Sequence, residues 1–124
     1  MTLEELYALI GGNYDQAMKV MRKEKLLDRY IRKLIDNEVC TALMASGEQM
    51  DDTGLYENAH ALKGVCANLG LDDLAAAASE ITEEFRPGNE RRLSDEDVKQ
   101  KLQALDASYK KTIEGVQQYV DAQA

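Results

Sequence analysis

From Val98 to Val120, apolar side chains recur at every third or fourth position of the sequence. The members of this stripe are Val98, Leu102, Leu105, Tyr109, Ile113, Val116 and Val120. This spacing places them all on one face of an amphipathic helix. Ser94, followed three residues later by Asp97, is typical of the residue that caps such a helix. We therefore expect a long helix at the C-terminal end of the chain, with a core-facing stripe along its length.

The rest of the chain favours helices as well. Ala, Leu, Glu, Lys and Gln dominate, β-branched runs are few, and Pro87 is the only proline. Thr2 and Glu5 have the spacing of a capping box, which predicts a short helix over about 3–10. The pair Gly11-Gly12 is expected to end it.

Further helices are predicted between these two. A second short helix carries Met18 and Met21 and is capped by Asn13 or Asp15. The segments that follow are a helix over about 24–46, a loop over about 46–54, and helices over about 55–69 and 72–85.

The ends of these segments carry their own signals. Gly70 is a natural residue to end the helix over 55–69, and Asp72 is expected to cap the next one. The clearest break in the chain is Arg86-Pro87-Gly88-Asn89. Whether a break at Lys23 precedes the helix over 24–46 stays open at this point.

Together the segments predict an all-α fold, an antiparallel four-helix bundle with one or two additional N-terminal helices. The chain has 124 residues, which fits one domain. Within it we expect N-terminal cap helices over about 1–23 and the bundle over about 24–120. The cap helices are expected to pack on one end of the bundle.

The charge of the chain excludes several classes of partner. Fifteen basic and 23 acidic residues give a net charge of −8, which argues against binding to nucleic acid or to anionic lipid. No apolar run approaches the roughly 20 residues that cross a bilayer. Residues 1–10 contain Glu4 and Glu5 but no lysine or arginine, unlike a signal peptide. We therefore expect a cytoplasmic protein that binds neither nucleic acid nor membrane.

The rare residues exclude several kinds of site. Cys40 and Cys66 stand among apolar neighbours, which is typical of buried thiols and not of a disulfide framework. His60 is the only histidine, so a zinc site is not expected. The sequence has no Gly-x-Ser-x-Gly elbow and no glycine-rich phosphate loop. We expect no metal and no cofactor bound by this chain.

The charged residues near the break at 86–89 are expected to face solvent. Glu80, Glu83 and Glu84 fit one polar face of the helix before it. Three arginines stand in or near the break, where they could also meet an acidic partner; they are Arg86, Arg91 and Arg92.

The helix over 55–69 carries residues that folding does not explain and that therefore suggest a function. On a helical wheel its core seam consists of Leu55, Ala59, Leu62, Cys66 and Leu69. His60 points away from this seam, with Tyr56, Lys63, Gly64 and Ala67 around it. An exposed histidine contributes nothing to folding, and a glycine inside a helix costs about 1 kcal/mol relative to alanine. Gly64 and Ala67 leave the surface beside His60 bare, so that another molecule can come close.

An exposed imidazole of this kind can carry a phosphoryl group. The lone pair of a neutral imidazole can accept the group and pass it on. Lys63, one turn after His60, can neutralise the charge of the phosphoryl oxygens. Phosphoryl transfer needs little more than in-line approach and such neutralisation. The helix offers neither a magnesium-binding cluster of carboxylates nor a nucleotide site, so a partner has to supply these.

The stretch Ala59-His60-Ala61-Leu62-Lys63-Gly64, followed by Asn68-Leu69-Gly70 and Leu74, resembles the histidine-containing phosphotransfer (HPt) family. That family reads Ala-His-x-Leu-Lys-Gly, with a second glycine six residues later and an apolar helix after it. The resemblance covers about residues 24–119, and the family's fold is similar to the four-helix bundle predicted above.

The resemblance implies a role for each residue of this face. His60 would accept a phosphoryl group from a phospho-aspartyl receiver domain, or from a hybrid sensor histidine kinase, and pass it to or back from another receiver. Lys63 would stabilise the charge of the group. Gly64, with Tyr56 and Ala67, would form the face on which the receiver docks. Mg²⁺ is expected on the receiver, and the chain would be a carrier and not an enzyme.

Two other readings stay open. The bundle could dock a receiver without ever being phosphorylated, or it could serve as a scaffold in which this face is a coincidence. The presence of both His60 and Lys63 favours the carrier, since a pure docking surface needs neither residue.

Overall fold

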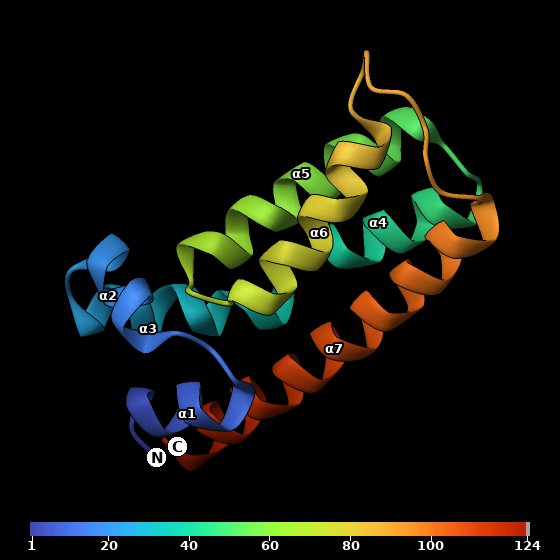
Figure 1. The fold of residues 1–124 in the computed structure, drawn as a ribbon. Helices are drawn as coiled ribbons and strands as arrows, with labels where there is room; N and C mark the ends of the chain where they lie inside the picture. The colour runs from blue at the N-terminus through green and yellow to red at the C-terminus, as the bar shows by residue number, and fades with distance from the viewer. Residues whose placement is uncertain (124) are drawn as a thin grey trace.

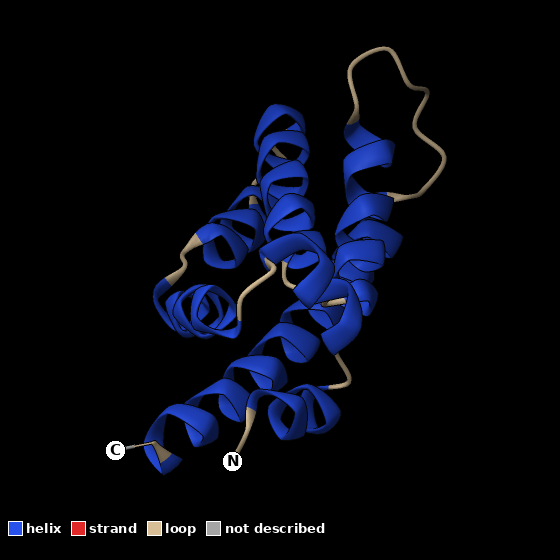
Figure 2. Ribbon diagram, turned by 90° about the vertical axis from the view of Figure 1, so that its left-hand side faces the viewer, coloured by secondary structure: helices blue, strands red, loops and turns tan. Residues whose placement is uncertain are grey.

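The computed structural model describes residues 1–123, and every element in that range is a helix (Figures 1 and 2). The elements are α1 (Leu3–Ile10), α2 (Tyr14–Met21), α3 (Glu24–Lys33), the 3₁₀ helix η1 (Leu34–Asp36), α4 (Val39–Glu48), α5 (Asp52–Asn68), α6 (Asp72–Phe85) and α7 (Asp95–Ala122). The predicted all-α class is therefore confirmed. None of these helices is both long and apolar enough to cross a membrane.

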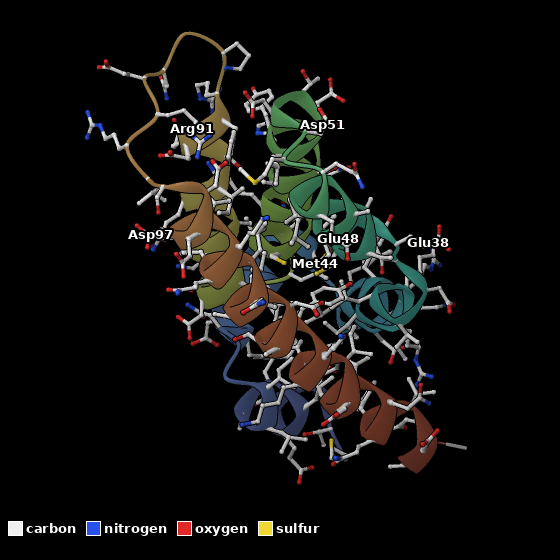
Figure 3. The ribbon with its side chains drawn as sticks, turned by 90° about the vertical axis from the view of Figure 1, so that its right-hand side faces the viewer. Glu38, Met44, Glu48, Asp51, Arg91 and Asp97 are labelled. Carbon is white, nitrogen blue, oxygen red and sulfur yellow. The ribbon has the colours of Figure 1, made fainter. Side chains whose placement is uncertain are left out.

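Helices α4, α5, α6 and α7 form the predicted four-helix bundle. They make a ring, because α5 packs on α4 and α6, and α7 packs on α6 and α4 (Figure 1). Short turns join α4 to α5 and α5 to α6, so these neighbours are antiparallel (Figure 1). Figure 3 shows the same arrangement from the side of α7, with α4 beside it between Glu38 and Asp51.

The N-terminal helices lie at one end of this ring. α7 is long enough to run past the bundle, and its C-terminal part packs on α1 (Figure 1). The two chain ends meet there, where the Gln123 side chain donates a hydrogen bond of 2.6 Å to the carbonyl oxygen of Met1. The hydroxyl of Tyr7 on α1 donates to the carbonyl oxygen of Leu69 at 2.7 Å, which ties α1 to the end of α5.

The core contains the side chains that the apolar patterns indicate. The whole predicted seam of α5 is between 0% and 3% exposed: Leu55, Ala59, Leu62, Cys66 and Leu69. On α7, Val98 to Tyr109 follow the predicted stripe, but Ile113 and Val120 are only half-buried. Thr112, Gly115 and Tyr119 are buried in that part of α7, because the helix there packs on α1 and α3.

The long helix predicted over about 24–46 is wrong, because the structure divides it into α3 and α4. The last turn of α3 tightens into η1, and Asn37 follows with extended backbone. The side chain of Asn37 then accepts a hydrogen bond of 2.9 Å from the backbone N–H of Val39, which starts α4. The hydroxyl of Tyr109 donates to the carbonyl oxygen of Leu34 at 3.2 Å and satisfies the end of the first segment. The break at Lys23 is present, with Arg22 in the left-handed region at φ 68°.

The loop predicted over about 46–54 is shorter in the structure. α4 continues to Glu48, and its Gly47 is buried under the side chain of Leu102. α5 already begins at Asp52, because the Asp51 side chain caps it by accepting a hydrogen bond of 3.2 Å from the N–H of Gly54. The glycines in this stretch therefore serve helix packing and a helix start.

Gly70 ends α5, as predicted. Its φ of +68° is in the left-handed region, and the N–H of Leu71 donates back to the carbonyl oxygen of Cys66 at 2.9 Å. A Cβ at position 70 would overlap the backbone oxygen of Asn13, so the turn packs directly on the start of α2. Asp72 is not the cap that the sequence suggested: Leu71 holds that position, and Asp72 lies in the first turn of α6, where a carboxylate favours the helix dipole.

The expectation that Glu84 faces solvent is wrong. Its carboxylate is buried and accepts hydrogen bonds from the backbone N–H groups of Leu93 (2.8 Å) and Arg92 (3.0 Å) and from Nε of Arg91 (3.0 Å). Arg91 also lies over the ring of Phe85, 4.5 Å from its centroid. Figure 3 places Arg91 beside the end of α6. These contacts fasten the loop between α6 and α7 to the last turn of α6.

We predict that Glu84→Gln lowers the free energy of unfolding by about 1–3 kcal/mol at neutral pH, because a neutral amide cannot accept all three hydrogen bonds. Burial acts to raise the pKa of Glu84, but the hydrogen bonds from Leu93, Arg91 and Arg92 outweigh it and hold the pKa below the ordinary 4.5. The contribution of the carboxylate is therefore complete above about pH 4.5 and is lost as the pH falls through the folded-state pKa. Urea unfolding of the wild type and Glu84→Gln should show that the difference in their free energies of unfolding becomes smaller in acid. A difference that does not change with pH would contradict this account.

Candidate functional site

His60 lies in the middle of α5 on the face that the helical wheel predicts. The side chain is exposed, while its neighbours Ala59 and Leu62 are completely buried. Gly64 and Ala67 are exposed on the following turns of the helix. The predicted orientation of this face is therefore correct, and it results from burial of the opposite seam.

Gly64 leaves an open space beside His60. A Cβ built at this position meets no atom within 4 Å. Packing thus gives no reason for a glycine here, in contrast to Gly70, where a side chain would overlap backbone. A glycine inside a helix lowers the stability of the helix. Its presence here is consistent with a function that needs the open surface.

Tyr56 lies one turn before His60 and stacks on it. The two ring centroids are 5.8 Å apart and the ring planes differ by 15°. Tyr56 is half-buried, and its hydroxyl oxygen accepts a hydrogen bond of 3.2 Å from Nη1 of Arg86. The guanidinium of Arg86 also lies 5.4 Å from the centroid of the Tyr56 ring.

Arg86 was expected to be solvated, but the structure holds it in place. It follows the last residue of α6, and its Nε and Nη2 donate to the carboxylate of Glu83 at 3.0 and 2.9 Å. The side chain of Asn89 donates to the backbone oxygen of Glu83 at 2.9 Å. Periodicity along the sequence does not reveal this group, because Tyr56 lies on α5 and Arg86 in the loop after α6.

Lys63 is half-buried on α5, one turn after His60. The hydrogen bond from Arg86 and the positive charges of Arg86 and Lys63 together hold the pKa of Glu83 below its ordinary 4.5. The same carboxylate raises the pKa of Arg86. Arg86 and Lys63 are therefore the two cations that act on the Glu83 carboxylate.

The cysteines are buried, as predicted, and take no part in this surface. Burial raises the pKa of Cys40 to about 11 and that of Cys66 to about 12, so both thiols stay protonated at neutral pH. A protonated thiol is a poor nucleophile. The imidazole of His60, in contrast, is open to solvent.

The site is a surface and not a cleft. A cleft of about 670 Å³ lies elsewhere, between α1, α6 and α7, and contains neither His60 nor its neighbours. Residues 1–123 hold no group of three or more side chains suited to bind a metal ion. His60 therefore lies on an open face of α5 and not in that cleft.

We predict opposite effects of the same substitution at the two glycines of α5 and its turn. Gly64→Ala should raise the free energy of unfolding by up to about 1 kcal/mol, because it adds helix propensity in open space. Gly70→Ala should lower it by about 1–2 kcal/mol or more, because of its left-handed backbone and the overlap with Asn13. Chemical unfolding of both variants checks this. A destabilising Gly64→Ala would show that the surface beside His60 is not bare.

Comparison with known proteins agrees with this geometry. A family model described as Hpt domain matches residues 23–118. Searches of the curated proteins and of the solved structures found no match. The matched residues run from the start of α3 nearly to the end of α7 and include His60, Lys63 and Gly64. The chain therefore belongs to the Hpt domain family and has a phosphotransfer role in two-component signalling.

Proposed function

We propose that the protein is a phosphoryl carrier with His60 as the residue that accepts and donates the group. The observation that carries this proposal is an exposed imidazole beside the bare surface of Gly64, on a helix that is otherwise well packed. The lone pair of His60 attacks the phosphorus of a phospho-aspartate. A nitrogen–phosphorus bond forms, the phosphorus–oxygen bond breaks, and the aspartate leaves as a carboxylate. The reverse sequence returns the group to a receiver.

Lys63 stabilises the phosphoryl group in this proposal. It stands one turn after His60 on α5 and is half-buried beside the exposed Gly64. An ammonium group near the phosphoryl oxygens offsets the charge that they carry during transfer.

The partner that we propose is a receiver domain, free or as part of a hybrid sensor histidine kinase. Gly64 and Ala67 give it a flat approach to His60, and Tyr56 borders the same face. The receiver supplies the aspartate and the Mg²⁺ that serves both directions of transfer. In this scheme the chain has no kinase activity of its own, and the cytoplasm stays the predicted location.

We predict that the protein acquires an acid-labile phosphoryl group when it is mixed with Mg²⁺ and a receiver phosphorylated by a small-molecule donor. Intact mass and peptide mapping should place the group on His60, and His60→Gln should abolish it while circular dichroism stays unchanged. Lys63→Ala should retain the label but acquire it about tenfold more slowly.

Two outcomes would overturn the carrier. Label in the His60→Gln variant would place the chemistry elsewhere. Binding to a receiver, without label from any receiver of the source organism, would favour the module that docks without phosphorylation.

We also predict that Gly64→Gln weakens docking. A long side chain at this position occupies the surface that the receiver needs, so the Kd for an unphosphorylated receiver should rise about tenfold, equivalent to about 1.4 kcal/mol. Gly64→Ala is the matched control, since it shares the change of backbone propensity but adds only one carbon. Calorimetric titration measures both. Equal affinities for the wild type and Gly64→Gln would exclude this face from the interface.

A further inference from the structure

We propose that Tyr56 and Arg86 are positioning residues that hold the imidazole of His60 in one orientation for transfer. This inference rests on the carrier function proposed above. It assigns to Arg86, in the loop after α6, an effect on the reaction that passes entirely through Tyr56.

The imidazole needs a support because nothing else fixes it. His60 is exposed, and within residues 1–123 no side-chain hydrogen bond reaches its ring. An exposed side chain normally changes rotamer within picoseconds to nanoseconds. In-line attack on phosphorus requires one nitrogen to point along the reaction axis. A ring that samples several rotamers meets this requirement only part of the time.

The stack with Tyr56 supplies that support. A separation of 5.8 Å between centroids and an angle of 15° between planes describe an offset, nearly parallel pair. A ring held parallel to Tyr56 has a fixed plane, so its nitrogens can point only in directions within that plane. The stack therefore limits the directions from which phosphorus can approach His60.

Tyr56 is itself held by Arg86, the first residue after α6. Arg86 donates to its hydroxyl oxygen at 3.2 Å, and the guanidinium lies 5.4 Å from the ring centroid. Glu83 fixes the guanidinium in turn with two hydrogen bonds, of 3.0 Å to Nε and 2.9 Å to Nη2. The side chains thus form a series of contacts from Glu83 through Arg86 and Tyr56 to His60.

This series of contacts starts beside a helix end that is held by the buried side chains of Glu84 and Phe85. Arg86 directly follows Phe85, whose ring lies under Arg91, and Arg91 is bound to the buried Glu84. The loop that carries Arg86 is therefore fastened to α6. Through Arg86, the end of α6 also holds Tyr56 on α5.

The test is a double-mutant cycle on the full chain. The variants are Tyr56→Leu, Arg86→Gln and the double variant, with Tyr56→Phe as the conservative change. Arg29→Gln is the matched control, because Arg29 is an exposed arginine on α3. Single-turnover transfer is followed at saturating phosphorylated receiver, and the Kd for the unphosphorylated receiver is measured separately. NMR couplings and ring chemical shifts of His60 report its rotamer in the free protein.

We expect Tyr56→Leu and Arg86→Gln each to slow the bound-state step about threefold to tenfold, with the Kd of Arg86→Gln unchanged within about twofold. The NMR couplings of His60 should move toward rotamer averages in both. The double variant should be no slower than Tyr56→Leu alone, because Arg86 acts through Tyr56. Tyr56→Phe keeps the ring and loses the hydroxyl, so it should behave like Arg86→Gln. Arg29→Gln should match the wild type.

Several results would overturn this inference. Multiplying effects in the double variant would show that Arg86 acts directly on the phosphoryl group or on the receiver. A raised Kd with an unchanged rate would make both residues docking contacts. Unchanged rates and couplings would remove their role. If wild-type protein takes no label on His60, the carrier function fails, and the NMR couplings still decide whether Tyr56 and Arg86 order the ring.

Discussion

Burial of one face of α5 fixes the geometry on which the rest of this protein depends. Leu55, Ala59, Leu62 and Cys66 are fully covered where α5 packs on α4 and α6, so the helix cannot rotate about its axis. Each residue of an α-helix is turned about 100° from the one before, and the direction of His60 follows from the burial of its neighbour. The imidazole of His60 is exposed because of core packing on the far side of its helix.

Contacts at the two ends of α6 fix the position of this helix beside α5. At one end, the turn at Gly70 packs against the start of α2 and closes α5 with a left-handed residue. At the other, the carboxylate of Glu84 binds the backbone of the following loop. Because both ends are fixed, α6 brings Glu83 and Arg86 alongside the exposed face of α5. The exposed face of α5 is then bordered by the charges of Glu83 and Arg86, and a partner can cover this surface.

The parts of the fold that the sequence predicts correctly are those with a long, regular apolar pattern. The seam of α5 and the first half of α7 are examples, since each repeats a helical spacing over several turns. The predictions fail where a short polar signal competes with that pattern. Asn37 divides the helix expected over 24–46 by bonding to the N–H of Val39. Asp51 starts α5 earlier than its glycine-containing first turn suggests, because a side-chain cap outweighs the low helix propensity of Gly54.

The sequence by itself determined the all-helical class and the grouping of His60, Lys63 and Gly64 on one outward face. Both follow from periodicity within single helices, where spacing along the chain sets direction in space. Only the tertiary structure decided that Arg86 holds Tyr56, that Tyr56 stacks on His60, and that Glu84 is a buried acceptor. The first and last of these contacts join a helix to the loop between α6 and α7. Their geometry depends on how the helices pack, and no local pattern of residues records it.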